Sequence, residues 1–176
     1  MEIVGIEEHR AQSPTSVGCA VITVSDTRTE ATDTSGQLIR DGLEGAGHMV
    51  LSSCIVPDEP PEIRRAIEEA TGTEGVKAVL LTGGTGITPR DRTAEVVSEM
   101  LDKPMDGFGE LFRIFSYDEI GAAAMLSRAV GGVAGGALVF AMPGSRAAVR
   151  LAMEKLILPD LGHLVFEMEK RPEKKE

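Results

Sequence analysis

Two short apolar runs constrain the fold of this chain more than any other feature of its sequence. Residues 20–24 (AVITV) and 78–81 (AVLL) lack the polar alternation of a strand with one face in water. Continuous runs of this kind are typical of parallel strands that helices cover on both faces. The two runs therefore predict the buried centre of an α/β sheet.

The segments around these runs are spaced like helices. Apolar residues recur at i, i+3, i+4 and i+7 within residues 60–71, and a similar spacing appears in residues 108–115 and 149–156. Each segment therefore predicts a helix with one buried stripe. In chain order we predict a strand at 19–24, a helix at 35–46, a strand at 48–56, a helix at 60–71, and strands at 78–82 and 137–141 with a last helix after them, which is a βαβ alternation.

Length and composition predict a single domain between two polar ends. A chain of 176 residues with 42% apolar content can bury one core without disulfides or a structural metal. Residues 1–17 mix charged and small polar side chains, and we predict a flexible N-terminal arm there. Residues 18–168 form the predicted domain, and residues 169–176 form a charged, solvated C-terminal tail.

The charge balance argues against two classes of partner. The formal net charge is −10, so most of the surface would repel nucleic acid or an anionic membrane, and we expect neither as a partner. The first residues do not resemble a signal peptide, and no apolar run is long enough to span a bilayer. Cys19 and Cys54 form neither a disulfide framework nor a metal-ligand cluster, which favours the cytoplasm.

A loop rich in glycine and hydroxyl groups follows the second apolar run directly. It reads TGGTGITPRDRT from residue 82 to residue 93. Three glycines between a strand and a helix weaken local structure unless the backbone must approach a ligand closely, so they favour anion binding by backbone N–H groups. Asp91 in the same loop could hold a metal ion against phosphate oxygens. The spacing matches neither the Walker pattern nor the dinucleotide fingerprint.

Polar residues follow the other predicted strands as well. Ligands of open α/β sheets gather beyond the carboxyl ends of the strands, so the residues at these ends are considered as one group. The group consists of Ser25, Asp26 and Thr27 after the first strand, Asp58 after the second, Thr82, Gly83, Gly84, Thr85 and Gly86 after the third, and Pro143, Gly144 and Ser145 after the last.

Each of these side chains also has an ordinary structural interpretation. Asp58 precedes two prolines, a common arrangement for a residue that caps a helix, and Asp91 could cap the helix that follows it. Ser35 and Ser145 stand at cap positions, and Asp26 fits a turn equally well. The pattern alone leaves capping, turn formation and ligand binding open.

Five short motifs then follow the order found in one known family. They are residues 82–86 (TGGTG), 89–93 (PRDRT), 107–110 (GFGE), 126–128 (LSR) and 142–145 (MPGS). Together they resemble the MoaB/MogA family of molybdenum-cofactor biosynthesis, over about residues 18–162. The same fold occurs in gephyrin's molybdopterin-binding domain. The resemblance implies a three-layer α/β/α domain with a mostly parallel central sheet that binds molybdopterin.

For MogA-like members the resemblance also implies an activity. Molybdopterin would be adenylylated by ATP with Mg²⁺ as cofactor, which gives adenylyl-molybdopterin and pyrophosphate. A metal ion and aligned amide donors would stabilise the charge that develops on the phosphate oxygens. By motif position, Asp58 and Asp91 are assigned to catalysis and to Mg²⁺. Binding of molybdopterin or the nucleotide is assigned to Ser25, Asp26, Thr27, Thr82, Gly83, Gly84, Thr85, Gly86, Glu110, Ser127, Arg128, Pro143, Gly144 and Ser145.

The chain departs from the usual family pattern after Asp91. The common Asp-Val-Thr-Pro-Glu run reads DRTAE here, so Arg92 replaces an apolar residue and Ala94 replaces a proline that would preorganise the first helical turn. Residues 112–116 and 140–145 resemble the MoaB branch, in which catalytic competence varies. We therefore weigh an adenylyltransferase against a non-catalytic molybdopterin-binding protein of the same pathway, and a generic nucleotide-binding module comes third.

The resemblance also implies partners. The family commonly forms trimers, or hexamers in the MoaB branch, so we expect a homo-oligomer. The apolar stripe from Phe108 to Phe115 is either a subunit contact or part of the intramolecular core. Hand-over of the product to a molybdenum-insertion protein is a further expectation.

Overall fold

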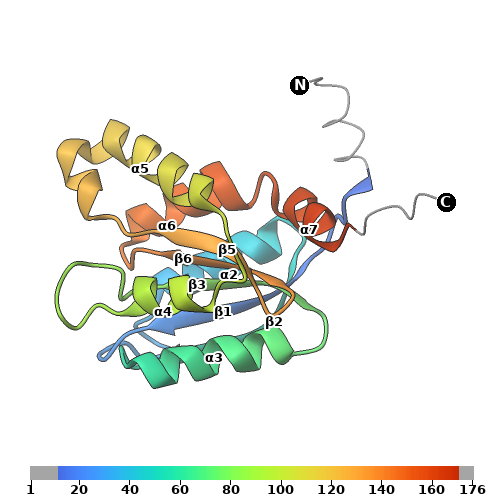
Figure 1. Ribbon diagram of the computed structural model, residues 1–176, viewed down its shortest axis with the longest axis horizontal. Helices are drawn as coiled ribbons and strands as arrows, with labels where there is room; N and C mark the ends of the chain where they lie inside the picture. Colours follow the sequence, from blue (N-terminus) through green and yellow to red (C-terminus); the bar gives the residue numbers. More distant parts are fainter. Residues whose placement is uncertain (1–11, 171–176) are drawn as a thin grey trace.

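A six-stranded sheet runs through the middle of the domain (Figure 1). The computed structural model describes residues 12–170, so most of the predicted arm and tail lies outside the described residues. The strands lie in the order β2-β1-β3-β6-β5-β4. β1, β2, β3 and β6 are parallel, whereas β5 is antiparallel to both β6 and β4. Their bounds are β1 Gly18–Val24, β2 Met49–Val56, β3 Val76–Thr82, β4 Lys103–Pro104, β5 Val130–Ala134 and β6 Ala137–Met142.

Helices cover both faces of the sheet, which confirms the predicted three-layer α/β/α fold (Figure 1). One apolar cluster joins the sheet to α2, α5, α6 and α7, and the other joins it to α3 and α4. The helices are α2 Thr34–Gly45, α3 Pro60–Gly72, α4 Thr93–Met100, α5 Asp106–Ile120, α6 Arg146–Ala152 and α7 Leu161–Glu169, with a 3-10 helix η1 at Gly121–Leu126 and a π-helix η2 at Met153–Ile157.

The two apolar runs form the buried centre of this sheet, as predicted. β1 lies between β2 and β3, and β3 lies between β1 and β6. Successive side chains of a strand point to opposite faces. Val21 and Leu80 accordingly belong to the cluster under α2 and α5, whereas Ile22 and Leu81 belong to the cluster under α3 and α4. Both faces need apolar side chains, so the two strands lack polar alternation.

The antiparallel edge of the sheet was not predicted. β5 contains two glycines and β4 has only two residues, one of them Pro104, so neither has the composition of a strand. The last helix that we predicted after Ser145 forms as α6 and continues without a break into η2, whereas α7 was not predicted. Pro159, which lacks a backbone N–H, lies between η2 and α7.

The apolar stripe of α5 belongs to the intramolecular core. Phe112 is fully buried, and the rings of Phe108 and Phe140 pack with their centroids 4.9 Å apart. Phe115 packs against the same cluster. The exposed side of α5 also carries large apolar side chains, Leu111, Ile114, Tyr117 and Ile120, beside the charged Glu110, Asp118 and Glu119.

The start of α2 depends on a buried carboxylate. The N-cap of α2 is Asp33, so the suggested cap at Ser35 is wrong. Asp33 accepts a hydrogen bond from the Gly36 N–H (2.9 Å) and another from the Thr23 hydroxyl on β1 (2.8 Å). Ser35 instead donates to the carbonyl of Gly144 (2.8 Å), which ties α2 to the end of β6. Asp33 therefore joins α2 to β1.

We predict that Asp33→Ala lowers the free energy of unfolding by about 2 kcal/mol, because the cap is lost and a buried hydroxyl loses its acceptor. Urea denaturation measures this change. Asp41→Ala on the exposed face of α2 is the matched control, and it should stay within about 0.5 kcal/mol of wild type. Equal stabilities of the two variants would contradict this account of α2.

Candidate functional site

The candidate site is built where the chain leaves β3. Gly83 and Gly84 have φ angles of 101° and 65°, a region that glycine adopts without a steric penalty. A Cβ atom on Gly83 would lie 2.2 Å from the Val24 carbonyl oxygen, so no side chain fits between β3 and β1 there. β2 and β3 pair with opposite sides of β1, which makes this a topological switch point where ligands of α/β sheets bind.

A cavity of about 440 Å³ opens against this loop. Its two walls differ in chemistry. One is formed by the glycine loop and the turn after β6, and the other by apolar side chains at the end of α5 and in η1, which lie at the same end of the sheet in Figure 1. Such a cavity suits a flat ring with an anionic group. It is lined by Gly83, Gly84, Thr85, Gly86, Asp91, Ile120, Ala123, Leu126, Ser127, Pro143 and Gly144.

Asp58 lies against this loop and is 8% exposed. Its Oδ1 accepts a hydrogen bond from the Arg92 N–H (3.3 Å), and its own N–H donates to Asp26 (3.1 Å). It does not cap α3, whose N-cap is Glu59. Burial raises the pKa of Asp58, and the nearby carboxylates of Asp91 and Asp26 raise it further. Its ionised form would therefore gain from a bound cation.

Asp91 is engaged within its own loop. Its Oδ2 accepts hydrogen bonds from the Thr88 hydroxyl (2.5 Å) and from the Thr88 N–H (2.9 Å). The bond from the hydroxyl is the main reason that the pKa of Asp91 is lowered. The N-cap of α4 is Arg92, so Asp91 is not a helix cap. Asp91 therefore holds the turn at 88–91 and also lines the cavity.

Arg90 links the ends of three strands. Its Nε and Nη2 donate to the two oxygens of Asp26, both at 2.8 Å, and its Nη1 donates to Glu59 at 2.5 Å. The bonds from Arg90 are the main cause that lowers the pKa of Asp26 to about 2. Asp26 follows β1, Glu59 follows β2 and Arg90 follows β3. The guanidinium therefore neutralises two acids beside Asp58.

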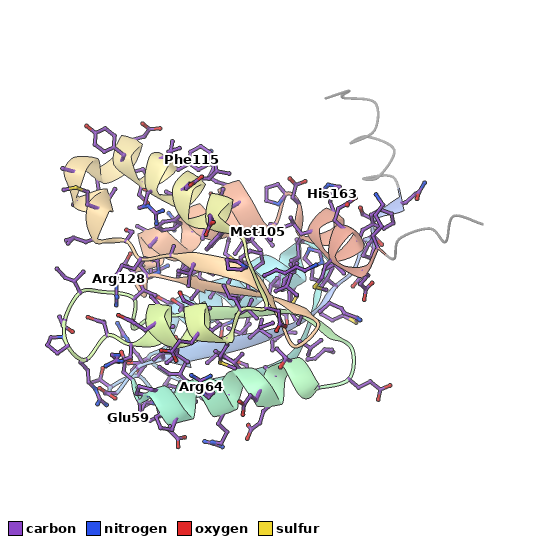
Figure 2. The ribbon with its side chains drawn as sticks, viewed as in Figure 1. Glu59, Arg64, Met105, Phe115, Arg128 and His163 are labelled. Atoms are coloured by element: carbon purple, nitrogen blue, oxygen red, sulfur yellow. The ribbon has the colours of Figure 1, made fainter. Side chains whose placement is uncertain are left out.

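Arg128 stabilises the glycine loop through hydrogen bonds to its backbone. It donates to the carbonyls of Thr85 and Asp91, both at 3.2 Å, and forms an ion pair with Glu95 that lowers the pKa of that carboxyl. Figure 2 shows Arg128 and Glu59 at the same end of the sheet. Arg128 is thus in the predicted place, but its hydrogen bonds hold the loop and the start of α4.

Three other predicted residues support the loops around the cavity. The Ser25 hydroxyl accepts from the N–H groups of Thr27 (3.2 Å) and Arg28 (3.1 Å), so residues 25–28 form a turn after β1. The Thr82 hydroxyl donates to the Pro143 carbonyl (3.3 Å) and joins the ends of β3 and β6. Ser25, Thr27 and Thr82 therefore hold the loops around the cavity in place.

Two predicted residues lie elsewhere. Ser145 is the N-cap of α6, where its side chain accepts from the Ala148 N–H. Glu110 lines a different cavity together with Arg113, between α4, the start of α5 and β5. Within the described chain, Glu110 is not brought to the glycine loop.

Sequence reasoning did not single out Thr93, although it stands in a quoted motif. Thr93 is fully buried, and its N–H donates to the Gly84 carbonyl at 2.9 Å. Its hydroxyl has no hydrogen-bond partner among the residues described. The apolar wall formed by Ile120, Ala123 and Leu126 was also not predicted, because its role depends on the path of η1 beside a distant loop.

The residues present fit a cation that shares its ligands with a substrate. Between residues 12 and 170 no group of three or more His, Cys, Asp and Glu side chains could hold a metal ion. Mg²⁺ is commonly held by one or two carboxylates together with substrate phosphates and water. Asp58 suits such a role because it is buried beside an unpaired hydroxyl.

None of the helices within residues 12–170 combines the length and the apolar character that a membrane span requires.

Comparisons with known proteins identify the family of the chain. A family model described as "Probable molybdopterin binding domain" matches residues 20–163, a range that contains every residue of the cavity. The chain belongs to this family. Molybdenum cofactor biosynthesis protein B of Bacillus cereus is 54% identical over 167 residues, which cover 94% of this chain and 99% of the relative.

Solved structures confirm the fold. A crystal structure of Molybdenum cofactor biosynthesis protein B has a TM-score of 0.88 and 56% identity, and the match covers 91% of this chain and 100% of that chain. A structure of MogA has a TM-score of 0.77 and 30% identity, with 86% and 99% covered. The predicted resemblance to the MoaB/MogA family, and to its MoaB branch, is therefore confirmed. The same comparisons support a place for the protein in molybdenum-cofactor biosynthesis.

Replacing Arg90 tests the electrostatics of the site. In Arg90→Met the pKa of Asp26 should rise from about 2 toward 3.8, and the pKa of Asp58, which Arg90 also lowers, should rise further. Because the Asp26 pKa lies below its unfolded value, the Arg90 pair stabilises the fold above about pH 4, and this contribution is lost as the pH falls toward 2. Carboxyl carbon NMR titration measures both groups. Arg65→Met on α3 is the control and should leave the pKa of Asp26 unchanged. If the pKa of Asp26 also stays at about 2 in Arg90→Met, Arg90 is not the main cause of its low value.

Proposed function

We propose that the protein catalyses the Mg²⁺-dependent adenylylation of molybdopterin by ATP. The observation that carries this proposal is the pair of carboxylates at the glycine loop: Asp91 lines the cavity, and the buried Asp58 lies against Gly84 in the cavity wall. The molybdopterin-binding family of the chain and its likeness to MogA support the choice of substrate.

The reaction requires one bond to form and one to break. An oxygen of the terminal phosphate of molybdopterin attacks the α-phosphorus of ATP, and the bond from that phosphorus to the bridging oxygen breaks, so that pyrophosphate leaves with the electron pair. Charge increases on oxygens that already repel one another. The N–H groups of Gly84 and Thr85, in the wall of the cavity, would stabilise this charge without a covalent enzyme intermediate. The Gly83 N–H instead donates to the Met142 carbonyl (3.1 Å), and the Gly86 N–H donates to Asp91.

Each wall of the cavity has a part in this reaction. Ile120 and Leu126 give an apolar surface for a planar ring, and the glycine loop faces the phosphate groups. Arg90 keeps Asp26 and Glu59 paired, so an incoming phosphate does not meet two further bare carboxylates. Asp58 would hold Mg²⁺, which when bound withdraws charge from the phosphate oxygens.

A second candidate is a molybdopterin-binding protein of the same pathway that does not turn over. The identity of 54–56% to Molybdenum cofactor biosynthesis protein B, against 30% to MogA, favours it. Arg92, the N-cap of α4, and Ala94 in its first turn point the same way, because the usual family pattern has an apolar residue and a proline there. Tight molybdopterin binding without ATP consumption would select this candidate.

We propose self-assembly through the exposed apolar face of α5, into a trimer or a hexamer. Leu111, Ile114 and Tyr117 lie on this face, and Ile120 joins it to the cavity. Native mass spectrometry of the protein measures the state directly. We place the reaction in the cytoplasm and expect a molybdenum-insertion protein to receive the product.

We predict that Asp58→Asn lowers kcat/KM for adenylyl transfer about 100-fold or more, because the site loses a preorganised charge. The assay incubates pure protein with molybdopterin, ATP and Mg²⁺ and follows the adenylylated product. Asp41→Asn, which removes an equal charge from the exposed face of α2, should keep wild-type activity. Failure of the wild-type protein to form product, under conditions where MogA does, would reject the proposal.

A further inference from the structure

Two charged side chains of α5 have no partner in the part of the chain that the structure describes. Neither the Arg113 guanidinium nor the Glu110 carboxylate forms a hydrogen bond or an ion pair within residues 12–170, although they are one helical turn apart. The other arginines without a side-chain partner in this range, Arg92, Arg146 and Arg150, are all exposed. Arg113 is half-buried. It has therefore lost part of its hydration, and a carboxylate that reaches it would form a charge-assisted bond.

The two charges belong to one outer face of α5. Glu110, Arg113, Ile114 and Tyr117 stand at positions i, i+3, i+4 and i+7 of this helix, so they lie side by side on its surface. Ile114 is 58% exposed and Tyr117 is 62% exposed. We call these four residues the outer face of α5, which combines one cation, one acid and two large apolar side chains.

Exposed apolar side chains gather around this face. Residues 111–126 contain six of the nine large apolar side chains that are exposed within the described chain. α5 lies at the edge of the molecule in Figure 1, and η1 follows it there. A contiguous group of this kind commonly marks a contact with another protein. The six are Leu111, Ile114, Tyr117, Ile120, Met125 and Leu126.

The surface beside the outer face is hollowed. Glu110 and Arg113 line a cavity of about 440 Å³ between α4, the start of α5 and β5, and Leu101 and Val130 give it apolar walls. A Cβ atom built on Gly109 would lie 3.0 Å from Arg113 Nη1, so the guanidinium lies back along the helix against Gly109. The cation is thus held in the wall of a hollow that a side chain of another molecule could enter.

The charges of this face select a second copy of the chain as its partner. A partner of one charge would satisfy only one of the two unpaired groups. Asp106, the other acid at the start of α5, lies in the first turn, where the helix N-terminus stabilises it. Glu110 is therefore the acid left for a partner. A second copy supplies both an acid and a cation at the same spacing, so each group meets its opposite.

We propose that the outer face of α5 is a contact between copies of this chain, in which Glu110 of one copy pairs with Arg113 of the next. The inference rests on the self-assembly in the proposed function and deepens it, because it names the charges that specify the contact. The apolar side chains supply the buried area, and the ion pair fixes which surfaces meet. The cavity beside Arg113 then receives the neighbouring copy.

Charge-reversal variants test the pairing. Glu110→Arg and Arg113→Glu each place like charges opposite one another, so each should weaken self-association about 100-fold or more. The double variant restores opposite charges and should assemble nearly as wild type does. An equimolar mixture of the two single variants should form complexes that contain both. Sedimentation over a dilution series and native mass spectrometry measure these states.

Two controls accompany the variants. Glu68→Arg makes the same change of charge on the exposed side of α3 and should leave the assembly unchanged. Far-ultraviolet circular dichroism should show wild-type helix content in each variant, because neither Glu110 nor Arg113 has a partner within the described chain.

The mixture distinguishes pairing between copies from pairing within one copy. Assembly that survives both single variants would overturn the inference, as would a double variant that stays dissociated. A mixture that stays monomeric while the double variant assembles, or a loss of helix content in the single variants, would also overturn it.

The proposed reaction is tested separately. A wild-type protein that is monomeric would overturn this inference together with self-assembly and leave adenylylation standing. If the variants behave as predicted but the wild-type protein forms no adenylylated molybdopterin, the proposed reaction fails and the contact stands.

Discussion

The close approach of backbone to backbone at the ends of β1, β3 and β6 is the constraint on which the site depends. Gly83 leaves no room for a side chain beside the Val24 carbonyl. A Cβ atom on Gly144 would lie 3.2 Å from the Cα of Gly83, so the turn after β6 packs against the same point. The loops that follow these strands therefore pack together without side chains between them. This places Asp26, Asp58 and Thr93 within one small region, although they are far apart in sequence.

The electrostatics of this region bear on the proposed binding of an anion by an acidic protein. The net charge of −10 predicts repulsion over most of the surface, so attraction must be local. The guanidinium groups of Arg90 and Arg128 are already bound to carboxylates and carbonyls, and these bonds hold the shape of the loop. In the proposed function, backbone N–H groups and a cation would hold the ligand. The burial that raises the pKa of Asp58 and the unpaired Thr93 hydroxyl both weaken the ligand-free fold. The proposed cation would stabilise the ionised form of Asp58.

Local sequence pattern predicted the parts of the fold that obey local rules. The runs at 20–24 and 78–81 are buried on both faces, and their continuous apolar character follows from that position. β5 could not be predicted, because a strand with two glycines depends on its neighbour β6 for its conformation. The role of Asp33 was also hidden, since a buried cap is recognised only when Thr23 on a neighbouring element is in place.

The residues of the candidate site likewise divide into those that local sequence predicts and those that depend on the folded chain. The glycine loop and Asp58 were found from their position after predicted strands, and the structure brings them together. Thr93 was missed as a separate group because its unpaired hydroxyl exists only in the folded chain. Glu110 was assigned from its motif alone, and the described chain places it in another cavity, with Arg113. A motif names a residue type at a position, whereas its partners depend on the path of the whole chain.

A crystal structure of the protein with AMP, molybdopterin and Mg²⁺ would test the central claim most directly. The account predicts the nucleotide phosphate against the backbone of residues 83–86, the planar ring against Ile120 and Leu126, and the metal ion beside Asp58. Ligands bound in the cavity of Glu110 and Arg113 instead, with the glycine loop free, would contradict it.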